Sequence, residues 1–117
     1  MSHPNKIKGE TGEAIAQAHL EANGYKILAK NFHSKYGELD LVARSPGGVI
    51  CFVEVKNYQP NAMVHPMEAI ERQMPKLRRA AQFYILKNNL TDVSMQFDAL
   101  IITDGKVSES FENITSL

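Results

Sequence analysis

The sequence has 117 residues, with 13 basic and 13 acidic side chains and a formal net charge of zero. A composition that is 44% hydrophobic and 22% charged is that of a globular protein, which excludes wholesale disorder, and the length predicts one domain, residues 1–117, with a single core. The balanced charge excludes a uniformly basic nucleic-acid-coating protein, but it permits a local basic face.

The chain shows no sign of export or of membrane insertion. Its first residues, MSHPNKIKGE, contain no apolar signal core, and no apolar run approaches the length of a membrane span. The single cysteine, Cys51, lies inside an apolar run, so we expect a buried thiol and no intramolecular disulfide. These features predict a cytoplasmic protein with no membrane partner.

Residues 5–23 have the pattern of a first helix. Its small residues suit close packing, and Asn23-Gly24 provides a stop, because glycine accepts the left-handed conformation that ends many helices. Glu13 shares a side of this helix with Ala16 and Leu20, so it borders the buried stripe. By position alone Glu13 is an ordinary acid near the helix start, stabilised by the helix dipole.

A strand is expected at residues 25–32, followed by a β-hairpin. The hairpin strands span residues 38–43 and 49–56, and the Ser45–Gly48 segment between them has the proline and glycine of a turn. Residues 57–66 read as a loop.

Both hairpin strands carry charges where an apolar strand should have none. Glu54 and Lys56 point to one face because side chains alternate along a strand, and Asp40 can reach that face from the neighbouring strand. Such a cluster is costly to bury unless it is paired or holds a metal. The residues alone leave two interpretations open, a salt bridge at a sheet edge and a functional site.

A second helical region covers residues 67–88. Because proline disrupts a helix interior, Pro75 predicts a short helix to about Gln73 and a longer one from near Pro75, ending at Asn88-Asn89. This region carries the densest basic run of the chain, which is either a solvated helix face or a binding surface. Its members are Arg72, Lys76, Arg78 and Arg79.

Residues 93–103 read as a strand, Asp104-Gly105 as a tight turn and residues 106–111 as a short edge strand, with weak order expected at 112–117. Three consecutive strands favour an antiparallel meander, and the strand-helix-strand unit over 49–103 favours a right-handed parallel crossover. The predicted fold class is therefore α/β, a mixed sheet flanked by helices.

Asp40 is followed by thirteen residues and then by Glu54-Val55-Lys56. This spacing resembles the core motif of the restriction-endonuclease-like PD-(D/E)XK superfamily, and Glu13 stands where its Holliday junction resolvases carry a helical acid. The fuller match is to the YraN-like family of uncharacterised bacterial proteins, which resembles those resolvases. The matching residues are Gly9, Gly12, Glu13, Leu20, Gly24, Tyr25, Asn31, Gly37, Glu38, Leu39, Asp40, Phe52, Val53, Glu54, Val55, Lys56, Lys76, Ala80 or Ala81, Phe97 and Asp98.

The resemblance implies a restriction-endonuclease-like fold and a Mg²⁺ or Mn²⁺ site. Asp40, Glu54 and the Val55 carbonyl would be ligands, with Glu13 holding a metal-bound water or a second ion. Lys56 would position the attacking water or stabilise the charge that develops on the phosphate. Beside this site stand Glu38 and Gln73. Nucleic acid, DNA above all, would contact Lys76, Arg78 and Arg79, and a homodimer is expected by resemblance.

Two positions depart from the family pattern. Tyr58 and His33 stand where the family commonly carries basic residues, which lowers the positive charge near a phosphate path. Three hypotheses remain: a metal-dependent DNA endonuclease acting on branched or structured DNA, a nucleic-acid-binding module with the nuclease fold and little or no turnover, and a structural or protein-interaction domain. Metal-dependent cleavage separates the first two, and salt-sensitive DNA binding separates both from the third.

Overall fold

Five strands form one mixed sheet in the order β1-β2-β3-β4-β5, in which β3 and β4 are parallel and the other neighbours antiparallel. The computed structural model describes residues 4–114, and side chains are described from residue 12 onward. The elements are α1 (Pro4–Ala22), β1 (Lys26–Ser34), β2 (Gly37–Arg44), β3 (Ile50–Tyr58), α2 (Pro66–Lys87), β4 (Met95–Thr103) and β5 (Lys106–Phe111). The meander, the parallel crossover through α2 and the restriction-endonuclease-like class are confirmed.

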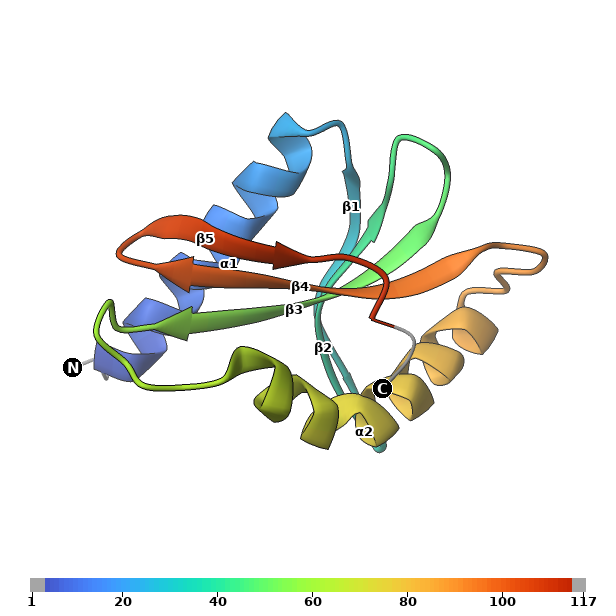
Figure 1. Ribbon diagram of the computed structural model, residues 1–117. Helices are drawn as coiled ribbons and strands as arrows, with labels where there is room; N and C mark the ends of the chain where they lie inside the picture. Colours follow the sequence, from blue (N-terminus) through green and yellow to red (C-terminus); the bar gives the residue numbers. More distant parts are fainter. Residues whose placement is uncertain (1–3, 115–117) are drawn as a thin grey trace.

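The two helices cover opposite faces of the sheet (Figure 1). One core lies between the sheet and α2 and includes Phe52, Met74 and Tyr84. The other lies between the sheet and α1 and includes Ala16 and Leu20. Because β3 contributes Phe52 to the first core and Val53 to the second, this strand is covered on both sides.

The α1 helix ends as its sequence predicts. Gly24 takes a φ of +85°, and the backbone N–H of Tyr25 donates to the Leu20 carbonyl at 3.0 Å. The side-chain nitrogen of Asn23, Nδ2, donates to the His19 carbonyl at 2.7 Å and so satisfies a further carbonyl in the last turn. The chain is thereby turned back into β1 along the sheet.

The prediction that Pro75 divides the second helical region is wrong. A single helix, α2, runs through it and bends midway (Figure 1). Pro75 has no N–H to donate to the Glu71 carbonyl, yet both residues are exposed, so water can satisfy that carbonyl. Buried residues on both sides of the proline hold the two halves on the same core; they are Ile70, Met74, Leu77, Ala80, Ala81 and Tyr84.

Side-chain alternation along β2 slips by one residue at Asp40. Leu39 packs in the α2-side core and Leu41 in the α1-side core, although strict alternation would place both on one face. Opposite this point on β1, Asn31 has a φ of +51°. The irregularity leaves Asp40 between the two faces, where its side chain can turn toward β3.

The segment after β5 packs closely as far as Ile114, contrary to the weak order expected from residue 112. Ile114 is buried in the α2-side core, and its N–H donates to the Phe97 carbonyl at 2.7 Å. The Asn113 N–H donates to Oδ1 of Asp98 at 2.8 Å. Residues 115–117 lie outside the described residues. Within residues 4–114, no helix is long and apolar enough to cross a membrane.

Candidate functional site

Strands β2 and β3 separate at Asp40. Their backbone pairing runs from Arg44–Ile50 to Leu41–Val53. One step further, Oδ2 of Asp40 accepts a hydrogen bond of 2.9 Å from the backbone N–H of Val55. A side chain thus takes the place of a backbone acceptor, and a carboxyl group is held at the fork between the two strands.

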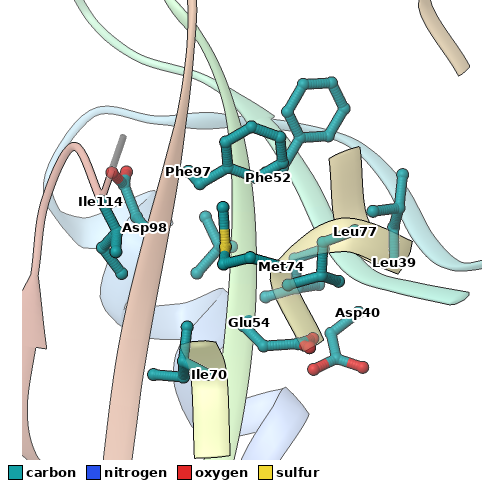
Figure 2. A pocket seen from close by; sticks show the side chains of 12 residues that line it. Leu39, Asp40, Phe52, Glu54, Ile70, Met74, Leu77, Phe97, Asp98 and Ile114 are labelled. Atoms are coloured by element: carbon teal, nitrogen blue, oxygen red, sulfur yellow. The ribbon is translucent and has the colours of Figure 1, made fainter. Parts of the chain in front are cut away.

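Glu54 brings a second carboxyl group to the same fork. It points to the α2 face, as Phe52 does two residues earlier, and only 9% of it is exposed. Figure 2 shows the carboxyl groups of Asp40 and Glu54 directed toward each other at the rim of an apolar pocket. The space inside that pocket, about 10 Å³, is at most that of one water, so apolar packing closes this side of the pair.

The environment of Glu54 favours its protonated form. Burial, a hydrogen bond with Asp40 and the charge of Asp40 raise its pKa to about 9, while Lys56 lowers the pKa and Glu13 raises it. Protonation of Glu54 relieves the repulsion between the two adjacent carboxyl groups. A divalent cation supplies the same charge neutralisation, so this pair is suited to exchange a proton for a metal ion.

The fork opens into a cavity of about 280 Å³ between the sheet and α2. Its lining residues are Gly37, Glu38, Asp40, Glu54, Val55, Lys56, Gln73, Lys76 and Leu77. The structure therefore brings together every predicted site residue except Glu13, Arg78 and Arg79. This convergence joins β2, β3 and α2, which no local sequence pattern connects.

Gln73 lines this cavity and carries an unsatisfied acceptor. Its Oε1 atom is buried and has no hydrogen-bond partner in the described part of the chain. Buried acceptors normally have a partner. A water held by a cation at the carboxyl pair would be such a donor, and oxygen ligands of this kind suit Mg²⁺, which keeps several of its waters. The residues present therefore fit a hard divalent ion.

Lys56 lines the cavity without closing a salt bridge across it. The ion pair found within 4 Å among the described side chains joins His33 of β1 to Glu38 of β2, at 3.0 Å, and both side chains are exposed. Lys56 acts on Glu54 through its charge alone. The ammonium group is therefore available to an anion in the cavity.

Glu13 lies on α1, which covers the face of the sheet opposite to α2, and it does not line the cavity. Its charge still reaches Glu54 and raises the pKa of that residue. Within the described residues, no three His, Cys, Asp or Glu side chains are arranged to hold a metal ion. The role of Glu13 as holder of a metal-bound water or a second ion stays a prediction, and Asp40 and Glu54 are the carboxyl groups that meet at the fork.

The basic residues of α2 lie on two sides of the helix, with Lys76 and Arg79 on one side and Arg78 on another. Lys76 lines the cavity, whereas Arg79 lines a separate groove with Tyr36 and Phe83. Arg78 is half-buried, and a turn of about 100° per residue places it on the flank of α2 away from Lys76. Arg78 and Arg79, although adjacent in sequence, therefore lie on different sides of α2.

The comparisons with known proteins agree with the family resemblance. The sequence profile of the uncharacterised protein family UPF0102 matches residues 12–102. The chain belongs to this family. UPF0102 proteins of Neisseria meningitidis serogroup C and of Persephonella marina are 38% and 35% identical to it, over 95% and 86% of this chain and 96% and 87% of theirs. A UPF0102 protein of Nitratiruptor is 37% identical over 98% of both chains. Membership of a family of uncharacterised bacterial proteins is confirmed.

The UPF0102 match includes all residues that line the cavity, and it also includes Asp98. The sequence shows Asp98 only as part of the matching Phe97-Asp98 pair and suggests no role for it. Asp98 is 6% exposed, and its Oδ1 accepts hydrogen bonds from Gln96 Nε2 at 2.9 Å and from the Asn113 N–H. These contacts tie the segment after β5 to β4. In this member of UPF0102, Asp98 therefore has a structural role.

Proposed function

We propose that this protein is a metal-dependent nuclease that hydrolyses phosphodiester bonds of DNA, with branched or otherwise structured DNA as its substrate. The observation that carries the proposal is the pair of carboxyl groups of Asp40 and Glu54, which meet at the rim of a cavity that also presents Lys56. A buried acidic pair beside a lysine is an arrangement that binds a cation and an anion together.

The pair is suited to Mg²⁺ or Mn²⁺. Asp40 and Glu54 would hold the ion through carboxylate oxygens, with the Val55 carbonyl as a further ligand by family resemblance. A bound ion neutralises the phosphodiester and lowers the pKa of water. Binding of such an ion would require Glu54 to be deprotonated, because a carboxyl group binds a metal as its carboxylate.

The remaining residues act on the substrate from fixed positions. Lys56 can stabilise the negative charge that develops on the phosphate in the transition state, an effect commonly among the largest in catalysis. The Gln73 Oε1 atom has no partner among the described residues and would accept a hydrogen bond from a water that reaches it. Lys76, exposed at the cavity mouth, can contact a phosphate of the DNA backbone, where such contacts position the substrate.

The test is a cleavage assay on linear duplex, single-stranded, flapped and four-way-junction DNA, and on matched RNA, with Mg²⁺, Mn²⁺ or chelator. We expect cleavage that requires the metal and falls to background in Glu54→Gln, a variant close in size that cannot ionise. Glu109→Gln, on the exposed face of β5, is the matched control and should cleave like the wild type. Molar mass measured in solution tests the expected homodimer.

A second candidate is a nucleic-acid-binding module of the same fold with little or no turnover. It is favoured by the zero net charge and by His33, which stands at a commonly basic position and is paired with Glu38. Salt-dependent DNA binding in the absence of cleavage with either metal would support this alternative and contradict the nuclease proposal.

A further inference from the structure

A groove of about 240 Å³ lies beside the cavity, between α2 and the turn that joins β1 to β2. Its lining residues are Tyr36, Arg79, Gln82, Phe83 and Leu86. The volume is below the roughly 300–1,000 Å³ of pockets that enclose drug-sized ligands, so it suits a single ring system. Tyr36 is 37% exposed and Leu86 76% exposed, which leaves apolar surface open to solvent.

The turn holds Tyr36 in place. The Ser34 hydroxyl donates to the Gly37 carbonyl at 2.8 Å and accepts a hydrogen bond from the Tyr36 N–H at 3.2 Å. The Tyr36 ring lies 5.9 Å from the Phe83 ring, centroid to centroid, at an interplanar angle of 57°. Phe83 is supported in turn by Phe32 at 6.1 Å. The groove therefore presents two adjoining aromatic rings, one held by the turn and the other packed on Phe32.

The charge around the groove is positive. Lys35 Nζ lies 5.2 Å from the centre of the Tyr36 ring, and Arg79 forms part of the wall. On α2, Arg72 and Lys76 are exposed on the side that carries Arg79 and Phe83, because these positions are three or four residues apart. Aromatic rings among cationic side chains match nucleic acid, which has flat bases on an anionic backbone.

The groove adjoins the cavity that holds Asp40 and Glu54. Gly37, the residue after Tyr36, lines that cavity, and a β carbon built on it would lie 3.6 Å from the Lys76 β carbon. Lys76 precedes Arg79 by three residues, less than one helical turn of about 5.4 Å. A strand that places a phosphate near Lys76 and Lys56 thus has its next base within reach of Tyr36.

We infer that the Tyr36–Phe83 groove stacks one unpaired nucleobase of a single-stranded segment next to the phosphodiester bond that is cleaved. The inference rests on the proposed nuclease function and specifies its substrate. Bases within a duplex are stacked on each other and offer no free face, so this groove favours DNA with an unpaired nucleotide. A second copy of the chain is the competing occupant, but the cationic rim would repel its like-charged counterpart.

The experiment compares Tyr36→Leu, which keeps an apolar side chain, with Tyr36→Phe, which keeps the aromatic face. Binding to single-stranded, tailed-duplex and blunt-duplex DNA is measured by fluorescence anisotropy with Ca²⁺, and gels verify that each probe stays intact. We expect Tyr36→Leu to lose about tenfold in affinity for the first two probes and less than twofold for the blunt duplex, while Tyr36→Phe matches the wild type. Thermal melting tests whether both variants are folded.

Photo-cross-linking of the wild type to a strand carrying 5-iodouracil gives a readout that needs no variant. A cross-linked peptide containing Tyr36 or Phe83 is expected, and cross-links confined to other peptides would overturn the inference. If DNA cleavage and binding persist unchanged in Tyr36→Leu, the inference fails while the proposed function stands. If Tyr36→Leu instead converts a dimer to a monomer without altering DNA affinity, the groove is a subunit interface. A wild type that binds no DNA overturns both.

Discussion

The backbone N–H of Val55 donates a 2.9 Å hydrogen bond to Oδ2 of Asp40 on the neighbouring strand. This bond makes Asp40 part of the fold as well as of the candidate site. It satisfies a donor at the point where β2 and β3 separate, and it orients the carboxyl group toward Glu54 (Figure 2). Substitutions of Asp40 should therefore have separable effects on stability and on metal binding.

Asp40→Asn and Asp40→Ala should differ in stability. An asparagine carbonyl can still accept the Val55 N–H and removes a negative charge beside Glu54, so we expect unchanged or higher stability without metal. Alanine leaves the N–H without its acceptor, at a cost of about 1–3 kcal/mol. Both variants should lose the rise in melting temperature that Mg²⁺ or Mn²⁺ gives the wild type. Equal stability of the two variants would show that the Val55 hydrogen bond contributes little.

The free energy of unfolding of the metal-free protein should decrease as the pH rises from about 4.5 to about 9. Because the folded state raises the pKa of Glu54 from 4.5 to about 9, it keeps a proton that the unfolded chain releases in this window. The contribution is complete below the lower value and lost above the upper one, with a slope of at most about 1.4 kcal/mol per pH unit. Urea denaturation in chelator measures it, and Glu54→Gln should lack this component. Parallel wild-type and variant curves would refute the protonated pair.

Lys56→Met should reduce cleavage by a factor of about 100–1,000 while the fold persists. Lys56 makes no ion pair within 4 Å with a described carboxylate, so its loss should change the free energy of unfolding by less than about 1 kcal/mol. Lys30→Met, on exposed β1, is the matched control. Loss of several kcal/mol in Lys56→Met, in a wild type that neither binds metal nor cleaves, would instead identify a buried ion pair.

DNA affinity should depend on Lys76 and Arg79 but not on Arg78. Lys76→Ala and Arg79→Ala remove cations from one side of α2, so each should weaken binding to all sequences and lower the salt slope by about one. Arg78 lies on the other flank, and Arg78→Ala should behave like Lys106→Ala at the start of β5. DNA-binding titrations at several salt concentrations measure these effects. An equal loss of affinity in all three α2 variants would contradict the placement of Arg78 on a separate side of the helix.

Asp98→Ala should destabilise the protein without abolishing cleavage. The substitution leaves the Asn113 N–H and the Gln96 amide without their acceptor, and the expected cost is about 2–3 kcal/mol. Unfolding by urea measures the loss, while cleavage is assayed below the transition. Complete loss of cleavage by a folded variant would place Asp98 in the catalytic site.

The sequence by itself determined the elements and the pair of strands that carries the site. Alternation places Glu54 and Lys56 on one face, the Ser45–Gly48 turn makes the hairpin, and Asn23-Gly24 ends α1, because each signal acts over a few residues. Such local signals did not predict that α2 continues through Pro75 as one helix. Apolar residues on both sides of the proline bury against one sheet and outweigh the lost hydrogen bond.

Only the tertiary structure decided which charged residues meet. The slip of alternation at Asp40 and the burial of Glu54 arise from the packing of the helices on the sheet, so neither follows from spacing. The structure also brought Gln73 and Lys76 to the carboxyl pair, kept Glu13 beyond the other face and turned Arg78 away. Local sequence sets the face on which a side chain lies, whereas the packing of helices on the sheet sets which faces share a cavity.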